Sequence, residues 1–347
     1  MLFDRVADLP VAVDSIDHTL RERETTSGFA RATTTVELSG EGETGRGEDV
    51  TYETEDHHEL AAAGLPDLTG ESTFAEFSAR VGELDLFPTP PEREVFRHYR
   101  RWGVESAALD LTLRQNGLDL SSALDRTYDP VEFVVSTRLG EPPTIDRLEQ
   151  VRDIRPNTEF KLDPTTDWSA DLAAEVADLA PVRICDLKGQ YEGTDVDAPA
   201  DPDLYELVLS TFPNAVIEDP RLTEETRPLF EGREGRVSWD APITGVESIE
   251  ILPFEPDWLN IKPSRFGSVA SLSESIEYCM DHDIRMYGGG QFELGVGRGH
   301  IQALAALFYP DGPNDVAPGG YNDPDFKGDL SPRPLDPPAE PVGFRWA

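Results

Sequence analysis

The sequence predicts an α/β fold in which a β/α barrel follows a smaller α+β domain. Seven short apolar runs recur between residues 131 and 290, about 25 residues apart, and segments with helical periodicity separate them. Continuous apolar runs of this kind are typical of buried parallel strands. No glycine-rich phosphate loop follows the first run, which favours a barrel over a doubly wound sheet.

The N-terminal part shows a different pattern. Residues 8–53 alternate between apolar and polar positions in three stretches, and the turn cluster GEGETG separates the last two, which predicts an antiparallel meander. Residues 91–117 have helical spacing, with prolines at the start and Gly117 after the end. We therefore expect an α+β domain over residues 1–125, the barrel over 126–321, and a Pro/Asp-rich tail over 322–347 that packs on the surface.

The seven runs are the candidate barrel strands. They are VEFVVS (131–136), TEFKLD (158–163), VRICDL (182–187), AVIEDP (215–220), RVSWDAP (236–242), WLNIKP (258–263) and IRMYGGG (284–290). The segments WSADLAAEVADL and VASLSESIEYCMDHD are examples of the amphipathic helices between them.

The composition limits the classes of function. The formal net charge is −38 and the sequence pI is about 4.3, which argues against binding to nucleic acid or to anionic membranes. Strong acidity with only four lysines suggests a halophilic, cytoplasmic protein that works in concentrated salt. We expect no signal peptide, no transmembrane helix, and two reduced cysteines in the core.

Charged residues stand where the apolar runs end. Because the strands of a barrel end at one mouth, we expect these side chains to converge there: Lys161, Asp186, Glu218, Asp240, Lys262 and, just after the seventh run, Glu293. Carboxylates on three consecutive strands would repel one another unless a divalent cation joined them, and oxygen ligands suit Mg²⁺ or Mn²⁺. The bland alternative is a set of solvated surface carboxylates, which are common in so acidic a chain.

The lysines favour a chemical role. Three of the four, Lys161, Lys188 and Lys262, fall at strand ends, and only Lys327 lies in the tail. Lys161 and Lys262 belong to strands on opposite sides of the barrel, so they could reach opposite faces of the carbon next to a substrate carboxylate. One would act as base and the other as acid, around a metal-stabilised enediolate.

These motifs, in this order, resemble the enolase superfamily and its muconate-lactonizing-enzyme subgroup. GRGEDVTY is similar to a segment of that family's capping domain, and TEFKLD is similar to its Lys-x-Lys strand, with Lys161 at the second lysine. Three segments, CDLKG, IEDP and SWDAP, resemble the metal-ligand strands of the family. NIKPSRFGS resembles the lysine strand of o-succinylbenzoate synthases, and MYGGGQFELGVG resembles the seventh strand of cycloisomerases. The resemblance implies a modified TIM barrel, (β/α)7β, with a capping domain, and a magnesium site at Asp186, Glu218 and Asp240.

Two residues depart from the family pattern. Glu159 replaces the first lysine of Lys-x-Lys, and Lys188 stands where Asn is usual. Lys188 would bind a second anionic group of the substrate, or form a salt bridge with a neighbouring carboxylate. The other candidate substrate contacts are Glu293, Arg265 and Tyr52, with free surface exposure as the alternative for Arg265. The loops over residues 21–29 and after Val50 would select the substrate.

The functional hypothesis is an enzyme that abstracts a proton α to a carboxylate of a small molecule. β-Elimination of the o-succinylbenzoate-synthase type, cycloisomerisation and epimerisation share this first step, so the sequence leaves all three open. An acid-sugar dehydratase is an alternative, although the seventh run contains no His. An alternative of another class is a non-catalytic protein that binds a carboxylate. The resemblance also implies a homo-oligomer.

Overall fold

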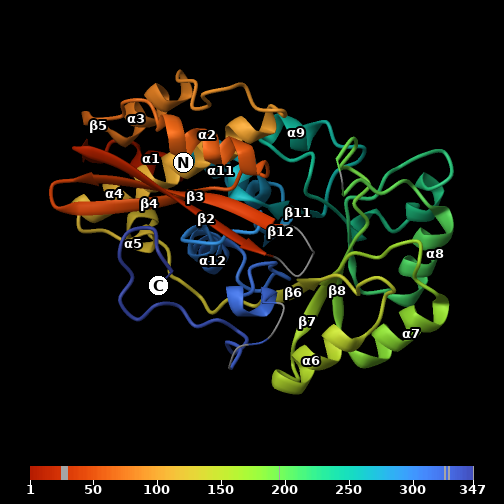
Figure 1. Ribbon diagram of the computed structural model, residues 1–347. Helices are drawn as coiled ribbons and strands as arrows, with labels where there is room; N and C mark the ends of the chain where they lie inside the picture. Colours follow the sequence, from red (N-terminus) through yellow and green to blue (C-terminus); the bar gives the residue numbers. More distant parts are fainter. Residues whose placement is uncertain (25–29, 195, 324–325, 327–328, 347) are drawn as a thin grey trace.

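The computed structural model describes the chain except for residues 25–29, 195, 324–325, 327–328 and 347 (Figure 1). The tip of the 21–29 segment, which was expected to select substrates, therefore lies outside the described residues. Lys327 lies outside them as well.

An antiparallel sheet forms much of the N-terminal part, as the alternating pattern predicts. Its order is β2 (Ser15–Glu24), β3 (Ala30–Gly40) and β4 (Glu43–Asp49). A second antiparallel pair joins β1 (Pro10–Val13) to β5 (Gly70–Thr73). The helices here are α1 (Asp4–Ala7), α2 (Thr54–Ala63), α3 (Phe74–Gly82), α4 (Val95–Gln115) and α5 (Leu120–Leu124).

Helix α4 packs directly on strand β4, and glycines permit the close approach. A Cβ atom at Gly47 would overlap the carbonyl oxygen of Gly103, and one at Gly45 would overlap the carbonyl oxygen of Ala107. The two backbones can therefore touch only where a side chain is missing. This contact accounts for the two glycines of the GRG segment, and it holds α4 against the sheet of the N-terminal part.

All seven predicted runs form strands of one parallel sheet, ordered as in the sequence. The strands are β6 (Val134–Thr137), β7 (Glu159–Leu162), β8 (Val182–Asp186), β9 (Val216–Glu218), β10 (Val237–Trp239), β11 (Trp258–Ile261) and β12 (Arg285–Gly288). The register places Asp186 opposite Glu218, so neighbouring strands end at the same level.

A short segment closes the gap between the outer strands β6 and β12. The N–H of Val134 donates to the carbonyl of Asn314 at 2.8 Å, and the N–H of Asp315 donates to the carbonyl of Gly288 at 2.8 Å. The Asn314 side chain also accepts the N–H of Gly288 at 2.6 Å. This segment occupies the eighth position of the curled sheet, which agrees with the predicted (β/α)7β barrel.

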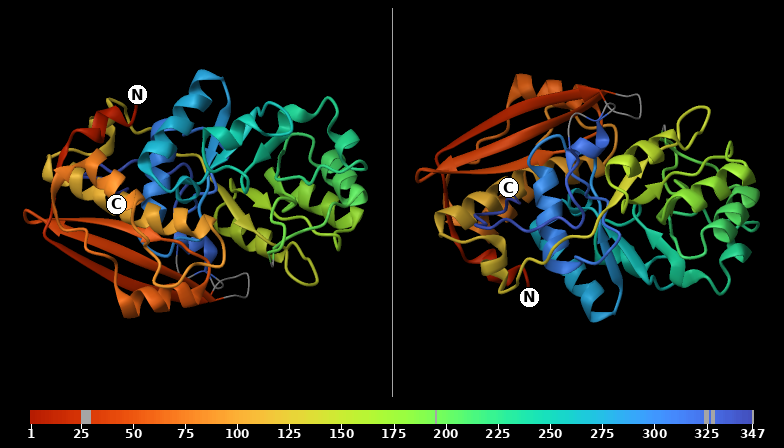
Figure 2. Two further views of the ribbon diagram at one scale, coloured as in Figure 1. Left: turned by 90° about the horizontal axis from the view of Figure 1, so that it is seen from above. Right: turned by 90° about the horizontal axis from the view of Figure 1, so that it is seen from below.

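Helices cover the outside of the sheet (Figure 2). In chain order they are α6 (Asp146–Ile154), α7 (Ala170–Leu179), α8 (Pro202–Thr211), α9 (Val246–Glu250), α10 (Pro263–Phe266), α11 (Val269–Asp281) and α12 (Gly297–Phe308), with short 3-10 turns η1 (Arg227–Phe230), η2 (Glu234–Arg236) and η3 (Gly319–Asn322). Helix α4 contacts this shell, because buried Glu105 accepts the N–H of Val269 at 2.9 Å.

The C-terminal tail returns to the N-terminal part and is held by one buried carboxylate. Asp110 of α4 accepts the N–H of Phe344 at 2.9 Å and the Arg345 guanidinium at 2.7 Å. The Phe344 ring stacks on His300 of α12, with centroids 4.1 Å apart. No helix among the described residues is both long enough and apolar enough to span a membrane.

Candidate active site

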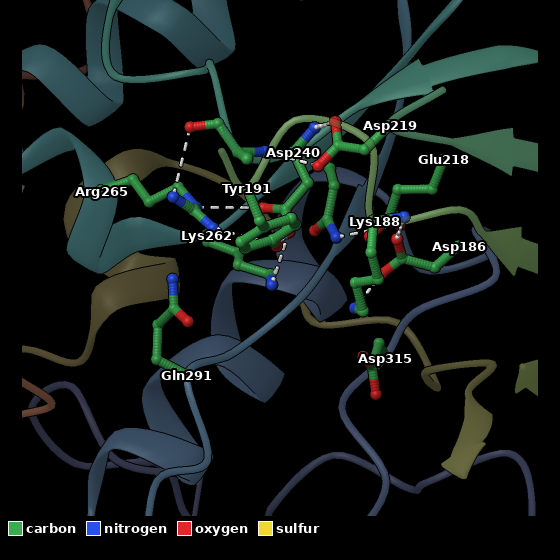
Figure 3. Close-up of polar contacts among 12 residues, drawn as sticks. Asp186, Lys188, Tyr191, Glu218, Asp219, Asp240, Lys262, Arg265, Gln291 and Asp315 are labelled. Carbon is green, nitrogen blue, oxygen red and sulfur yellow. Dashed lines mark hydrogen bonds and ion pairs between the residues drawn. The ribbon is translucent and has the colours of Figure 1, made fainter. Parts of the chain in front are cut away.

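The structure brings the predicted strand-end residues together at one mouth of the barrel (Figure 3). Asp186 and Glu218 end β8 and β9, and Asp240 and Lys262 directly follow β10 and β11. We call Asp186, Glu218 and Asp240 the carboxylate triad. All three triad side chains are fully buried, and Lys161 and Lys262 are only 2% and 6% exposed. The alternative of solvated surface carboxylates is therefore wrong.

Each carboxylate of the triad is paired with a cation. The Lys161 ammonium lies 2.5 Å from Glu218 Oε1 and 3.3 Å from Asp186 Oδ2. The Lys262 ammonium lies 2.7 Å from Asp240 Oδ2. The two lysines thus flank the triad from β7 and from the end of β11, as the spacing predicts.

Arg265 is buried at this site, so its alternative interpretation as a surface arginine is wrong. It is 5% exposed, and its Nε donates to Asp240 Oδ1 at 3.1 Å. Its Nη2 donates to the hydroxyl of Tyr191 at 3.2 Å, and that hydroxyl donates to Asp240 Oδ2 at 2.7 Å. Asp240 is therefore held on both oxygens by positive or hydroxyl donors.

Lys188 forms the salt bridge that the sequence left as one of two options. Its ammonium donates to Asp186 Oδ2, and it lies 3.6 Å from Asp163 Oδ1. Its backbone has a φ of 54°, in the left-handed region, and its N–H donates to Asp186 Oδ1 at 3.1 Å. This turn folds the side chain back over the carboxylate two residues earlier.

The other departure from the family pattern, Glu159, is neutralised within the protein. Arg183 donates to Glu159 Oε2 at 2.7 Å, and Arg333 of the C-terminal tail donates to the same oxygen at 2.5 Å. A carboxylate at the start of β7 is thus paired with two arginines.

The electrostatics of the triad are uneven. Burial raises the pKa of Glu218, and although Lys161 opposes this, repulsion from Asp186 and Asp240 helps to bring the pKa to about 8. Burial acts in the same direction on Asp240, but Arg265 and Lys262 hold its pKa well below the usual range. Burial therefore outweighs the cation beside Glu218, whereas the two cations beside Asp240 outweigh burial.

The ammonium groups respond to the same carboxylates. Burial lowers the pKa of Lys161, but its ion pairs with Glu218 and Asp186 outweigh this, so the pKa is raised well above its usual value. For Lys262 burial again opposes, and Asp240 makes the net shift upward. Both lysines are held as ammonium ions in this arrangement.

The triad has the donor chemistry that a divalent cation needs. Three buried carboxylates on consecutive strands offer the hard oxygen ligands that such a cation prefers. The buried Oδ1 of Asn260, whose amide donates to Glu218 at 3.3 Å, has no hydrogen-bond partner among the described residues. Within that same part of the chain the three carboxyl groups do not converge on one point, because each faces its own cation. Mg²⁺ binding stays a prediction.

Two predicted substrate contacts lie farther along the mouth. The Tyr52 hydroxyl donates to Gln291 Oε1 at 2.9 Å, and the Gln291 amide donates to Tyr99 at 3.2 Å. Glu293 accepts the N–H of Gln291 at 2.6 Å and lies 3.6 Å from Arg298. Tyr52 thus joins the N-terminal part to the loop after β12, and Glu293 braces that loop.

Several residues at the mouth were not singled out from the sequence. Asp219 accepts the N–H of Asp240 at 2.8 Å, and Asp315 lies 3.7 Å from the Lys161 ammonium. Tyr287 donates to Glu218, and Tyr191 donates to Asp240. Asp219 directly follows the triad residue Glu218, so its position at the mouth could have been predicted from the sequence. Asp315 follows no predicted strand, so its position could not.

Comparison with known proteins places this fold. The structure is similar to muconate cycloisomerase from Pseudomonas fluorescens, with a TM-score of 0.64, 18% identity, and coverage of 88% of this chain and 87% of that one. It is also similar to a dipeptide epimerase from Methylococcus capsulatus, with a TM-score of 0.63, 17% identity, and coverage of 85% and 87%. A member of the enolase superfamily from Listeria innocua matches at a TM-score of 0.61 and 18% identity, over 88% of this chain and 85% of that one.

The fold is therefore the one shared by these muconate cycloisomerase, dipeptide epimerase and enolase-superfamily structures. The chain is also 26% identical over 226 residues to o-succinylbenzoate synthase of Bacillus subtilis (strain 168), an alignment that covers 62% of this chain and 58% of that relative's length. The chain belongs to the family described as Domain of unknown function (DUF8230), whose N-terminal domain matches residues 4–123 and whose C-terminal domain matches residues 127–323.

Proposed function

We propose that this protein is a Mg²⁺-dependent enzyme that removes a proton from the carbon next to a substrate carboxylate. One observation carries the proposal: two buried lysines, Lys161 and Lys262, flank three buried carboxylates at the mouth of the barrel. Buried charged groups lower the stability of a fold and are typical of functional sites, so their presence here indicates such a site.

Each residue has a distinct part in this proposal. Asp186, Glu218 and Asp240 would hold the cation, which when bound would take up the substrate carboxylate and lower the energy of the charge that develops on it. A cation bound by the carboxylates would take over the charge that now holds Lys161 and Lys262 as ammonium ions, and so would lower the pKa of the lysine that acts as base. Lys161 and Lys262, on opposite sides, would then remove the α-proton and return a proton or stabilise the enediolate. Burial of all five side chains keeps water away from the reacting carbon.

β-Elimination of the o-succinylbenzoate-synthase type is the first reaction to test. Three curated relatives at 25–26% identity bear that name, and the NIKPSRFGS segment with Lys262 resembles the lysine strand of such synthases. Epimerisation is the second, because two lysines on opposite sides of one carbon can exchange its proton from either face.

The test is a deuterium-exchange screen in D₂O with molar KCl and Mg²⁺. The panel contains the menaquinone precursor, N-succinyl amino acids, dipeptides, muconates and acid sugars, and NMR or mass spectrometry follows exchange and product. We expect one class to react, and we expect Lys262→Ala and Lys161→Ala to slow the reaction by at least about 100-fold.

A matched control separates chemistry from folding. Arg285→Ala removes an exposed cation at the other end of strand β12 and should leave the rate unchanged. Equal exchange rates in wild type and in Lys262→Ala would remove Lys262 from the mechanism. A protein that neither binds Mg²⁺ nor is stabilised by it would contradict the proposed function as a whole.

A further inference from the structure

The strongest unexplained feature of the site is a fourth cation. The triad carries three carboxylates, and four cationic side chains already bind them: Lys161, Lys188, Lys262 and Arg265. Lys188 differs from the others because its side chain is 19% exposed and can move toward solvent. It also donates two hydrogen bonds to Asp186, one from its ammonium and one from its backbone N–H.

We infer that Lys188 is an internal counter-cation that competes with the divalent ion for Asp186 and so sets the affinity of the site for metal. This inference rests on the proposed function, because it concerns the same cation. The ammonium bonds Asp186 Oδ2, an oxygen that a metal on the triad would need. Two cations on one buried carboxylate repel each other, so metal binding requires the ammonium to leave.

A second position for the ammonium already exists. Asp163 Oδ1 is buried, has no hydrogen-bond partner among the described residues, and lies 3.6 Å from Lys188 Nζ. The other oxygen of Asp163 accepts Arg138 Nε at 3.2 Å, so the carboxylate is held in place. A rotation of the lysine side chain would exchange Asp186 for Asp163 and satisfy an orphaned acceptor.

The backbone at Lys188 supports a replaceable side chain there. A φ of 54° is disfavoured for lysine and tolerated by asparagine, so Lys188→Asn removes the ammonium without straining the turn. Lys188→Arg keeps the charge. Arg285→Met is the control, because it removes an exposed cation at the start of β12 whose ion-pair partner is Asp257.

The experiment is a calorimetric titration with Mg²⁺ after EDTA treatment, at fixed ionic strength in KCl. Lys188→Asn should bind Mg²⁺ at least about tenfold more tightly than wild type, while Arg285→Met stays within about twofold. Asp163→Asn should weaken binding in the wild-type background and have less effect in Lys188→Asn, because the two act through one ammonium. Equal affinities in wild type and Lys188→Asn overturn the inference alone. No Mg²⁺ binding by any variant overturns the proposed function with it.

A measurement on the unaltered protein covers the case in which the variants do not fold. The chain has only four lysines, so reductive methylation can be mapped residue by residue by mass spectrometry. Mg²⁺ should increase the labelling rate of Lys188 severalfold, because its ammonium leaves Asp186. KCl added at the same ionic strength in place of Mg²⁺ should leave that labelling rate unchanged. A labelling rate of Lys188 that does not change with Mg²⁺ overturns the inference.

Discussion

His300 makes a sharp prediction about stability and pH. Its ring is fully buried against Phe344, and neither ring nitrogen has a hydrogen-bond partner among the described residues. The charged groups that face it are Asp110 of α4 and Arg345 of the tail. Burial is the main cause that lowers the pKa of His300 from 6.5 to about 4, with Asp110 opposing and Arg345 adding to the shift.

The sign follows from proton binding. Between these two pKa values the unfolded chain binds a proton at residue 300 and the folded chain does not, so stability rises with pH there. The contribution is complete above pH 6.5 and is lost as the pH falls toward 4. At about pH 5 the loss is about 2 kcal/mol relative to neutral pH.

The assay compares urea unfolding of wild type and His300→Phe, which keeps the ring stack and does not titrate. Measured in molar KCl at about pH 7.5 and about pH 5, the free energy of unfolding should fall by about 2 kcal/mol more in wild type. The carboxylates are common to both proteins, so their titration cancels in the difference. If the two proteins lose equal stability, the buried neutral imidazole is not what the structure implies. His300→Gln, which also does not titrate, should behave as His300→Phe does.

Three further outcomes follow from other parts of the fold. Asp110→Ala should lower the free energy of unfolding by about 3 kcal/mol, because it leaves buried donors unpaired. The C-terminal segment around Phe344 should then become sensitive to limited proteolysis, and protection equal to that of wild type would contradict this. Gly47→Ala should lower the free energy of unfolding in urea by about 3 kcal/mol, because its Cβ would overlap the backbone of α4. Gly319→Ala, with open space around the added Cβ, should leave the free energy of unfolding unchanged. Equal losses in the two variants would refute the close packing of α4 on β4. Raising KCl from about 0.1 M to about 1 M should increase the melting temperature by several degrees, because screening relieves the repulsion of a chain of net charge −38, and a flat salt response would count against it.

The sequence contained enough to place the barrel and its central charges. Each strand lies within a short, mainly apolar run, and in a parallel sheet the residue that ends such a run lies at the shared mouth. The strand ends therefore suffice to position Asp186, Glu218 and Asp240, whatever the course of the helices. The scarcity of lysine then drew attention to Lys161 and Lys262, which the structure pairs with the triad.

The remaining site residues depend on loops whose course the sequence does not encode locally. Arg265 follows the end of β11 by four residues, and the short helix α10 turns it inward onto Asp240. Tyr191 arrives through the loop after β8. Asp315 belongs to a Gly/Pro-rich stretch with no strand periodicity, so nothing in its neighbourhood marks it as a neighbour of Lys161.

The segment at residues 314–315 has a consequence for synthesis of the chain. It supplies the hydrogen bonds that join β6 to β12, and it lies beyond the last barrel helix, α12. Until it leaves the ribosome, both outer strands present free edges that can pair with other chains. The same segment brings Asp315 to Lys161, so a nascent chain completes the charge cluster at the mouth of its barrel at the moment the parallel sheet loses its free outer edges.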